Sequence, residues 1–214
     1  DVDRVFDETM ADWKAFFERW GAPLSLEEQR GLLGELLVLE RLIGAGDVSR
    51  VRDWMGPDGK LHDFESDSWH IEVKTSIRND PTAMIHPIEQ LDLHELPFNL
   101  VLVKLVNGEG MSLPSKISEF RSNGEINKST PDREHFERML EKIGYRDEDS
   151  KHYSREYSPE AEMTRHDVNS SETLLQTRRI AAEVQFDTIR WRLRSSQHDF
   201  IDCSDGFWAD PSVY

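Results

Sequence analysis

The chain has 214 residues, of which 37% are hydrophobic, and its 42 acidic and 26 basic side chains give a formal net charge of −16. This length predicts one domain with a sizeable core, and no apolar run approaches the roughly 18 to 20 residues that a membrane span needs. The single Cys203 excludes an intramolecular disulfide framework and a Cys-based zinc site, so a cytoplasmic location is the simplest expectation. The acidic balance argues against binding nucleic acid through net charge, because phosphate affinity rests on Lys and Arg.

The first predicted element is a helix over residues 3–20, where apolar side chains recur at spacings of one, three and four. The N-terminus is acidic and lacks an apolar segment, so no signal peptide is expected. It also lacks an initiating Met, which is compatible with a fragment of a longer protein. Gly21 ends this helix. Ser25 and Glu28 then form a predicted capping box for a second, leucine-rich helix that runs to about Ile43 and is expected to be well buried.

Three strands are predicted next, near residues 48–54, 61–65 and 69–77, with turn chemistry at residues 56–59. A short helix over residues 88–95 follows. The order helix, three strands and helix, completed by the strand described below, predicts an α/β core.

The continuous apolar run over residues 99–106 predicts a central strand that is covered on both faces. Residues 115–121 and 132–143 are predicted to be helices, whereas the polar stretch over residues 145–171 is expected to be a loop or irregular. Residues 188–194 alternate apolar side chains with Arg, which predicts a half-exposed strand with a basic face.

The chain is accordingly divided into three parts. Residues 1–24 are expected to form an N-terminal helix that packs on the core, and residues 25–110 to form the core itself. Residues 111–214 are expected to be a C-terminal extension of helices, a polar loop and a late strand that packs on the same domain.

Glu72 and Lys74 lie two residues apart on the third predicted strand, so their side chains share one face while Ile71 and Val73 point into the core. A carboxylate and an ammonium group among apolar neighbours are costly unless something uses them. Pairing of the second and third strands can bring Asp63 beside Glu72. Two adjacent carboxylates repel, and Mg²⁺ or Mn²⁺, which prefer oxygen ligands, relieve that repulsion. A Lys beside such a cation orients or deprotonates a water, which suits phosphodiester hydrolysis.

Glu35 is a charged residue among leucines in the second helix, within the sequence GLLGELL of residues 31–37. A buried carboxylate needs a partner such as a metal, a water shell or a base. Gly34 beside it lets another backbone approach closely. We therefore expect the helix to pack on the hairpin and to direct Glu35 at the same cluster.

A helix Glu, a strand Asp and then Glu-x-Lys resembles the PD-(D/E)XK nuclease superfamily. The stretches GLLGELLVLERLI, DWMGPDGKLHDF and HIEVKTS more specifically resemble a little-characterised PD-(D/E)XK-motif family encoded near bacterial restriction and phage-defence genes. The resemblance covers residues 31–106 well. It implies a restriction-endonuclease-like αβββαβ core with a mixed central sheet flanked by helices, to which helical and β decorations are added.

The resemblance also implies roles for the clustered residues. Asp63 and Glu72 are expected to bind the metal, Lys74 to be the catalytic lysine, and Glu35 to be the helix carboxylate that acts through a water or a second ion. The Val73 backbone carbonyl is a further candidate metal ligand.

Two details depart from the superfamily pattern. Gln90 is a candidate auxiliary residue, but the Gln-x-x-x-Tyr form of RecB-like nucleases is replaced here by Gln90 and His94. His62 precedes the strand Asp where the superfamily name has Pro. The literal Pro57-Asp58 pair lies in a Gly-flanked turn, so Asp63 is the preferred metal carboxylate.

Other interpretations remain open at this stage. An isolated Glu-x-Lys is most often a cross-strand ion pair on a solvated face. No histidine spacing of a familiar zinc motif is present. A group of arginines near the C-terminus is either a solvated face or a phosphate-contacting face; together with Arg78, its members Arg190, Arg192 and Arg194 are the candidate DNA contacts.

The first hypothesis is an Mg²⁺-dependent DNA endonuclease of restriction or phage defence, in which Mn²⁺ is expected to replace Mg²⁺. The alternative is a non-catalytic nuclease-fold subunit that binds DNA or a partner protein in a restriction-type complex, which the charge of −16 motivates. A different acidic-site phosphohydrolase is a third, weaker hypothesis. The expected partners are DNA, other restriction or defence subunits and a second copy of the chain, and no membrane.

Overall fold

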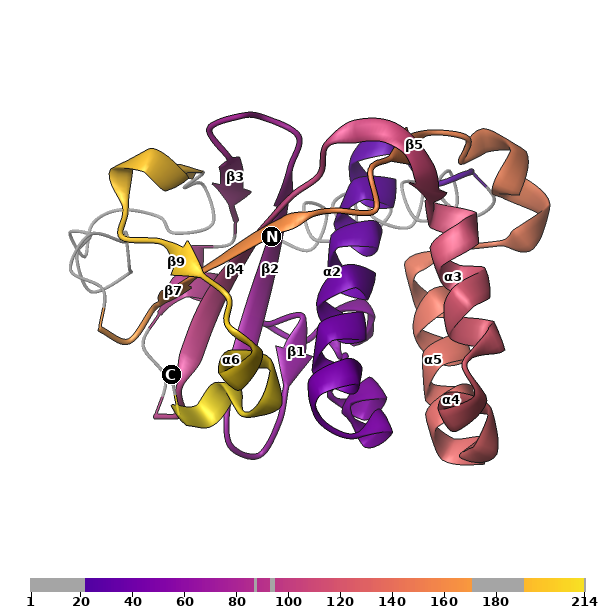
Figure 1. Ribbon diagram of the computed structural model, residues 1–214, viewed down its shortest axis with the longest axis horizontal. Coiled ribbons are helices and arrows are strands. Elements are labelled where there is room, and N and C mark those ends of the chain that lie inside the picture. The colour runs from indigo at the N-terminus through magenta and orange to yellow at the C-terminus, as the bar shows by residue number, and fades with distance from the viewer. Residues whose placement is uncertain (1–21, 87, 93–94, 171–190, 214) are drawn as a thin grey trace, which may run out of the picture.

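The computed structural model describes residues 22–86, 88–92, 95–170 and 191–213 (Figure 1). Its α-helices are α2 (Leu26–Ala45), α3 (Leu113–Ser122), α4 (Gly124–Lys128), α5 (Thr130–Ile143) and α6 (Asp205–Ala209). Its 3₁₀ helices are η1 (Val48–Asp53), η2 (Gly56–Asp58), η3 (Ile88–Leu91), η4 (Asp147–His152), η7 (Ser195–Gln197) and η8 (Pro211–Val213). Its strands are β1 (Phe64–Glu65), β2 (His70–Ser76), β3 (Thr82–Ile85), β4 (Phe98–Lys104), β5 (Asn107–Ser112), β6 (Glu156–Tyr157), β7 (Glu162–Asp167), β8 (Trp191–Arg194) and β9 (Ile201–Asp202). The helix predicted over residues 3–20 lies outside the described residues.

The central sheet has five strands in the order β1-β2-β4-β7-β9. Strands β2 and β4 are parallel, whereas the other neighbouring pairs are antiparallel. Figure 1 shows α2 beside this sheet and α3, α4 and α5 in a layer beyond α2. Strands β3 and β8 form a separate antiparallel pair, and β5 pairs with β6. The predicted α/β class with a mixed sheet flanked by helices is confirmed.

Helix α2 is the main support of the sheet. Its N-terminus carries the predicted capping box, in which the Ser25 side chain accepts from the backbone N–H of Glu28 and the Glu28 side chain accepts in return. Its buried leucines pack in one core with Ile71 and Val73 of β2. The predicted second helix is therefore confirmed in both its start and its burial.

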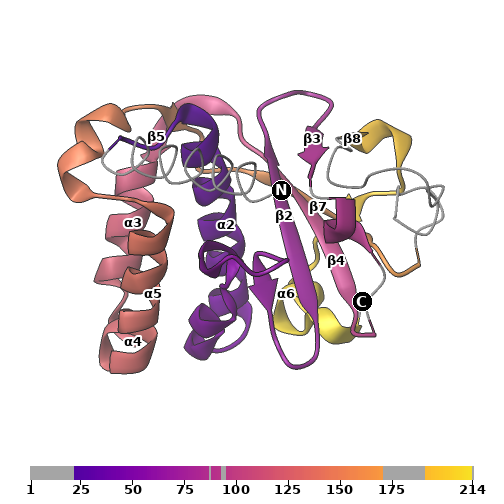
Figure 2. The same ribbon diagram turned by 180° about the vertical axis from the view of Figure 1, so that it is seen from behind.

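Strand β4 lies in the middle of the sheet, as its continuous apolar sequence predicts. Val101 and Val103 belong to the core on the α2 side, whereas Leu100 and Leu102 belong to a second core on the opposite side. Strands β3 and β8 contribute side chains to the second core, and Figure 2 shows them away from α2. A strand with both faces covered has no need of alternating polar residues.

The strand predicted over residues 48–54 is wrong, because most of this segment forms the 3₁₀ helix η1. The Asp47 side chain caps it by accepting from the Ser49 N–H at 2.7 Å, and Arg50 pairs with Asp53 three residues later at 3.4 Å. The first contact caps the N-terminus of the helix, and the second joins residues about one helical turn apart. Trp54 alone makes an isolated bridge, to Phe64.

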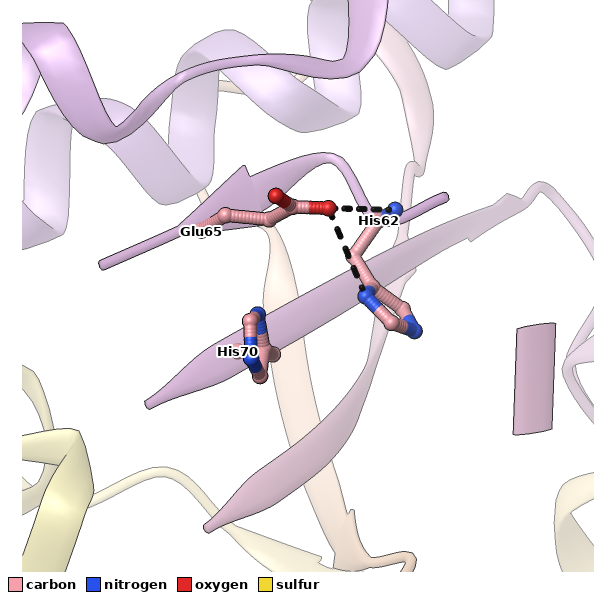
Figure 3. Close-up of side chains that lie close together, drawn as sticks. All are labelled: His62, Glu65 and His70. Atoms are coloured by element: carbon pink, nitrogen blue, oxygen red, sulfur yellow. Dashed lines mark hydrogen bonds and ion pairs between the residues drawn. The ribbon is translucent and has the colours of Figure 1, made fainter. Parts of the chain in front are cut away.

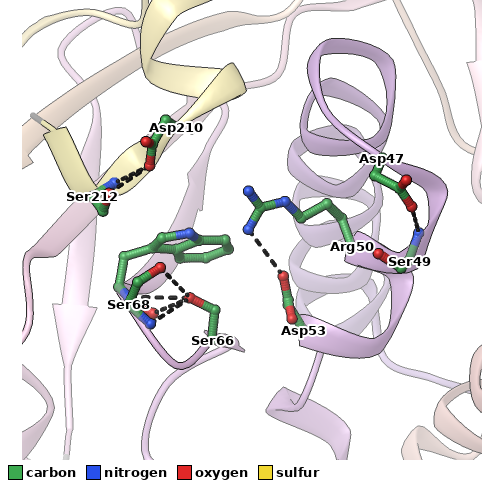
Figure 4. A network of polar contacts seen from close by, with 9 residues as sticks. Asp47, Ser49, Arg50, Asp53, Ser66, Ser68, Asp210 and Ser212 are labelled. Carbon is green, nitrogen blue, oxygen red and sulfur yellow. Dashed lines mark hydrogen bonds and ion pairs between the residues drawn. The ribbon is translucent and has the colours of Figure 1, made fainter.

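A polar network ties η1 to the turn between β1 and β2 (Figure 4). The Arg50 guanidinium lies 5.2 Å from the centre of the Trp69 ring, and the Ser66 side chain accepts from the Trp69 N–H at 3.1 Å. Asp210 and Ser212 bring the C-terminal segment to the same region. This network holds the hairpin from one end.

The irregular segment expected over residues 145–171 is also partly wrong, since it contains η4, β6 and β7. Strand β7 pairs with β4 over six residues in the middle of the sheet. Several residues of this strand are polar and pair with side chains of other elements. Its sequence therefore lacks the alternation of apolar and polar residues expected of a strand. Arg165 donates to Asn99 at 3.0 Å and covers the Phe207 ring, and Glu162 pairs with Lys104.

The remaining predictions mostly hold. The two helices predicted over residues 115–121 and 132–143 correspond to α3 and α5, and the late strand is β8, with Arg192 and Arg194 exposed. The short helix predicted over residues 88–95 is reduced to the 3₁₀ helix η3 in the described residues. Among the described residues, no helix combines the length and apolar character that a membrane crossing requires.

Gly34 is the point of closest approach between α2 and β2. A Cβ atom at this position would lie 2.0 Å from Oγ1 of Thr75 and 3.2 Å from its Cβ. The predicted close approach is thus present, although a side chain of β2 rather than a backbone makes it. The glycine sets the distance between the helix and the sheet.

We expect Gly34→Ala to lower the free energy of unfolding by about 1–3 kcal/mol, because the methyl group would force α2 away from β2. Gly31→Ala on the same helix is the matched control, since a Cβ there has nothing within 4 Å. The control should be neutral or stabilising by up to about 1 kcal/mol. Urea unfolding followed by circular dichroism measures both, and equal effects of the two substitutions would contradict this packing.

Candidate functional site

A pocket of about 500 Å³ lies where β2 becomes the open edge of the central sheet. Strand β1 pairs with only the first two residues of β2, so the later part of β2 has no strand on that side. Helix α2, the segment before β1, strand β2, strand β3 and η3 all contribute to the wall. The lining includes the candidate residues Glu35, Asp63, Glu72, Val73, Lys74 and Gln90.

Asp63 occupies the place that β1 leaves free. It lies directly before β1, and its Oδ2 accepts from the Val73 backbone N–H at 2.7 Å. This hydrogen bond replaces a ladder bond at the open edge and fixes the carboxylate. Because the N–H and C=O of one strand residue point to the same side, the Val73 carbonyl also faces this edge. The backbone of Asp63 is held as well, since its carbonyl accepts from Met55 and Gly56.

Glu35 reaches the same place from α2. The indole N–H of Trp54 donates to its Oε2 at 2.7 Å, which fixes the carboxylate although leucines surround it along the helix. Gly56 lies between the two elements. A Cβ at this position would lie 2.8 Å from Oδ1 of Asp63 and 3.4 Å from Oε2 of Glu35. Only a residue without a side chain fits there while both carboxylates keep their positions.

Glu72 and Lys74 project from one face of β2, as the alternation predicts. The Glu72 side chain is 1% exposed and the Lys74 side chain 19%. The Lys74 ammonium donates to Oε1 of Glu72 at 2.5 Å and to Oε1 of Gln90 at 3.1 Å. The ammonium group is thus held between a strand carboxylate and the side-chain amide of η3.

Burial makes ionisation of these carboxylates costly. Burial, reinforced by the Asp63 charge, raises the pKa of Glu35 well above its ordinary value, although the Trp54 hydrogen bond opposes the shift. Burial and Asp63 likewise raise the pKa of Glu72 to about 8, against the pull of Lys74. Burial also raises the pKa of Asp63. For Lys74, burial lowers the pKa, but the three carboxylates outweigh it and the net shift is upward. One ammonium group therefore does not balance the buried carboxylate of Glu72 and the half-buried carboxylates of Glu35 and Asp63.

The arrangement fits a divalent cation. Its donors are carboxylate oxygens, which hard cations such as Mg²⁺ and Mn²⁺ prefer. Oε2 of Glu72 is shielded from solvent and accepts no hydrogen bond from the residues that the structure describes. A buried carboxylate oxygen of this kind needs a donor or a cation. Asp63 and Glu72 are the best placed to hold such an ion, with Glu35 nearby.

The other candidate residues are distributed as follows. Asp58 of the literal Pro-Asp pair forms an ion pair with Lys142 of α5 and is not part of the pocket wall. Arg78 lines the pocket, and Arg192 and Arg194 lie on β8 nearby. Arg190 is outside the described residues, as is His94.

Trp54 and Gly56 were missed from the sequence. Trp54 falls at the end of a segment that resembles a strand, and Gly56 belongs to a sequence with ordinary turn chemistry. The only available signal is their position shortly before Asp63. Their contacts with Glu35 depend on how α2 packs, which local patterns do not specify.

Comparison with known proteins identifies a family for this chain. A family model described as "Putative PD-(D/E)XK family member, (DUF4420)" matches residues 2–184. This range contains all of the clustered residues and excludes β8. No curated protein and no solved structure shows significant similarity to the chain.

Without metal, we expect the free energy of unfolding to fall as the pH rises from about 4.5 to about 8. In this range Glu72 is ionised in the unfolded chain but still binds its proton in the folded protein, so a rising pH favours unfolding. Glu72→Gln should reduce this slope, and saturating Mg²⁺ should reduce it in the wild type. Urea unfolding at several pH values in chelator measures the slope.

Glu134→Gln, on the exposed side of α5, is the matched control and should keep the wild-type slope. If the free energy of unfolding depended on pH equally in the wild type and in Glu72→Gln, the raised pKa of Glu72 would not be the cause of that dependence.

Proposed function

Because the chain belongs to the DUF4420 family and through it to the PD-(D/E)XK superfamily, we propose that it is a divalent-cation-dependent nuclease that hydrolyses phosphodiester bonds in DNA. Members of this superfamily generally use divalent metals. Mg²⁺ is the expected ion, and Mn²⁺ is expected to replace it. The role in restriction or phage defence stays a prediction.

One observation carries this proposal: Asp63, Glu72 and Lys74 meet at the open edge of β2, with a Glu72 oxygen that is buried and accepts no hydrogen bond from the described residues. Family membership alone supports the fold and the superfamily. The presence of the motif residues in the lining of one pocket supports the proposal that they act together. A solvated ion pair would leave Glu72 exposed, but it is 1% exposed.

Each residue has a distinct role in the proposed reaction. A bound divalent cation supplies positive charge that offsets the charge developing on the phosphodiester. Asp63 and Glu72 hold that cation. Lys74 carries its proton, since its pKa is raised, so it acts as a hydrogen-bond donor that orients the attacking water or the phosphate. Glu35, whose carboxylate accepts from the Trp54 indole, is the candidate acceptor of the proton that the water loses.

A basic rim beside the pocket supports a nucleic acid substrate. Arg192 and Arg194 lie opposite Met84 and Thr82 in the antiparallel β3–β8 pair, and directly opposed residues point to the same side. Met84 and Thr82 themselves line the pocket, as does Arg78. Arg78 in the pocket wall, with Arg192 and Arg194 on the adjoining strand, would supply contacts for the DNA backbone on a protein of net charge −16.

Cleavage of supercoiled plasmid DNA with Mg²⁺ tests the function. We expect Lys74→Ala, Asp63→Asn and Glu72→Gln each to reduce the rate at least about 100-fold, because each removes a group that acts on the reacting phosphate or on its cation. Chelator should abolish the wild-type activity.

Asp58→Asn is the matched control. It makes the same change in the literal Pro-Asp pair outside the pocket and should keep the wild-type rate. Unfolding curves for each variant separate lost chemistry from lost structure. Equal rates in wild type and Lys74→Ala would contradict the proposal, and salt-dependent DNA binding without turnover would favour the non-catalytic alternative.

A further inference from the structure

A second group of metal-binding side chains lies on the β1–β2 hairpin (Figure 3). It consists of His62 before β1, Glu65 in β1 and His70 at the start of β2. One ligand atom from each lies within 4.8 Å of the other two. Nδ1 of His62 is 3.7 Å from Oε1 of Glu65, and the two imidazole ring centres are 5.2 Å apart. The carboxylates of the candidate active site are not part of this group.

The hairpin itself brings these residues together. Glu65 and His70 are directly opposite each other in the antiparallel β1–β2 pair, so their side chains share one face. His62 reaches the same face from the preceding bend, and its ring centre lies 4.4 Å from that of Phe98 in the core. Its side chain is 1% exposed and that of Glu65 is 22% exposed. Packing therefore holds the His62 side chain, whereas the Glu65 side chain remains accessible to solvent.

The chemistry of these donors differs from that of the active-site pocket. Two imidazole nitrogens and one carboxylate oxygen form a ligand set that Zn²⁺ uses, with a fourth position left for water. Ligand atoms around a tetrahedral Zn²⁺ are separated by about 3.3 Å, given bonds of about 2.0 Å. The His62–Glu65 separation is already close to that value, and modest side-chain rotation would close the rest. Mg²⁺ has little preference for imidazole.

We propose that His62, Glu65 and His70 bind Zn²⁺ and that this ion fastens the segment carrying Asp63 to β2. The two ladder pairs between β1 and β2 are a small number to hold this segment. An ion that joins residues on both sides of Asp63 to His70 adds a further constraint to the hydrogen bonds that already hold Asp63. None of its ligands belongs to the proposed catalytic set.

Apart from its contact with Nδ1 of His62, the Glu65 carboxylate already has two long contacts, of which the first is a hydrogen bond that its Oε1 accepts from the His62 backbone N–H at 3.5 Å. The Lys60 ammonium lies 3.8 Å from Oε2 of Glu65, and the Lys60 side chain is 53% exposed. A solvent-exposed pair at this distance is weak, so Zn²⁺ can displace it.

The test measures Zn²⁺ binding by competition with a chromogenic chelator, with Mg²⁺ in large excess to saturate the carboxylate pocket. We expect one Zn²⁺ per chain in the wild type. His70→Gln and Glu65→Gln should each weaken binding by at least about 100-fold, since even the loss of an outer-shell partner costs 10–100-fold. Co²⁺ substitution should give the intense visible absorption of a four-coordinate site. His152→Gln, an exposed histidine on η4, is the matched control and should bind like the wild type.

Hydrogen exchange of residues 62–65 tests the fastening role, and Zn²⁺ should slow it in the wild type but not in His70→Gln. Unfolding curves show whether the variants remain folded. Unchanged Zn²⁺ affinity in both ligand variants, or no Zn²⁺ bound to the wild type under excess Mg²⁺, would overturn the site. Unchanged exchange on Zn²⁺ binding would overturn the fastening. None of these readouts depends on DNA cleavage, so failure here and failure of the nuclease proposal are distinguishable.

Discussion

Three carboxylates, one of them buried and two half-buried, share the pocket at the open edge of β2 with one ammonium group, and this imbalance of charge governs the rest of the site. Glu35, Asp63 and Glu72 all have raised pKa values because burial penalises their ionised forms. Lys74 stays protonated among them. Such a cluster is stable when the carboxylates take up protons or when a cation joins them. The chemistry proposed for the protein follows from the second possibility.

The surrounding fold keeps the carboxylates close in spite of their repulsion. Strand β1 begins only at Phe64, so the Val73 N–H donates to the side chain of Asp63 instead of to a strand partner. Two glycines create the necessary space, since Gly34 lets α2 approach β2 and Gly56 leaves room beside the carboxylates. The Trp54 indole holds Glu35 in place. The site therefore depends on the length of one strand and on the absence of two side chains as much as on the acidic residues.

Much of this site could be predicted from the sequence, because the strongest signals are local. Alternation on a strand places Glu72 and Lys74 on one face, and a charged residue among leucines marks Glu35. The contributions of Trp54 and the strand β7 could not be predicted in this way. Trp54 acts through a helix that is distant in sequence, and β7 satisfies its polar side chains through partners on other elements, so neither leaves a periodic pattern. The group formed by His62, Glu65 and His70 likewise could not be predicted, because the pairing of β1 with β2 brings these residues together and their spacing matches no familiar metal-binding motif.

The net charge of −16 argues less strongly against DNA binding once the pocket is known. Part of the acidic excess is the proposed cation site, and the arginines of β8 pair in register with Thr82 and Met84 of the pocket wall. Anomalous diffraction from crystals soaked in Mn²⁺ tests the central claim most directly. The expected result is a peak between the carboxylates of Asp63 and Glu72 in the wild type and its loss in Asp63→Asn. A wild-type crystal that shows Mn²⁺ elsewhere on the protein but none between these two residues would contradict it.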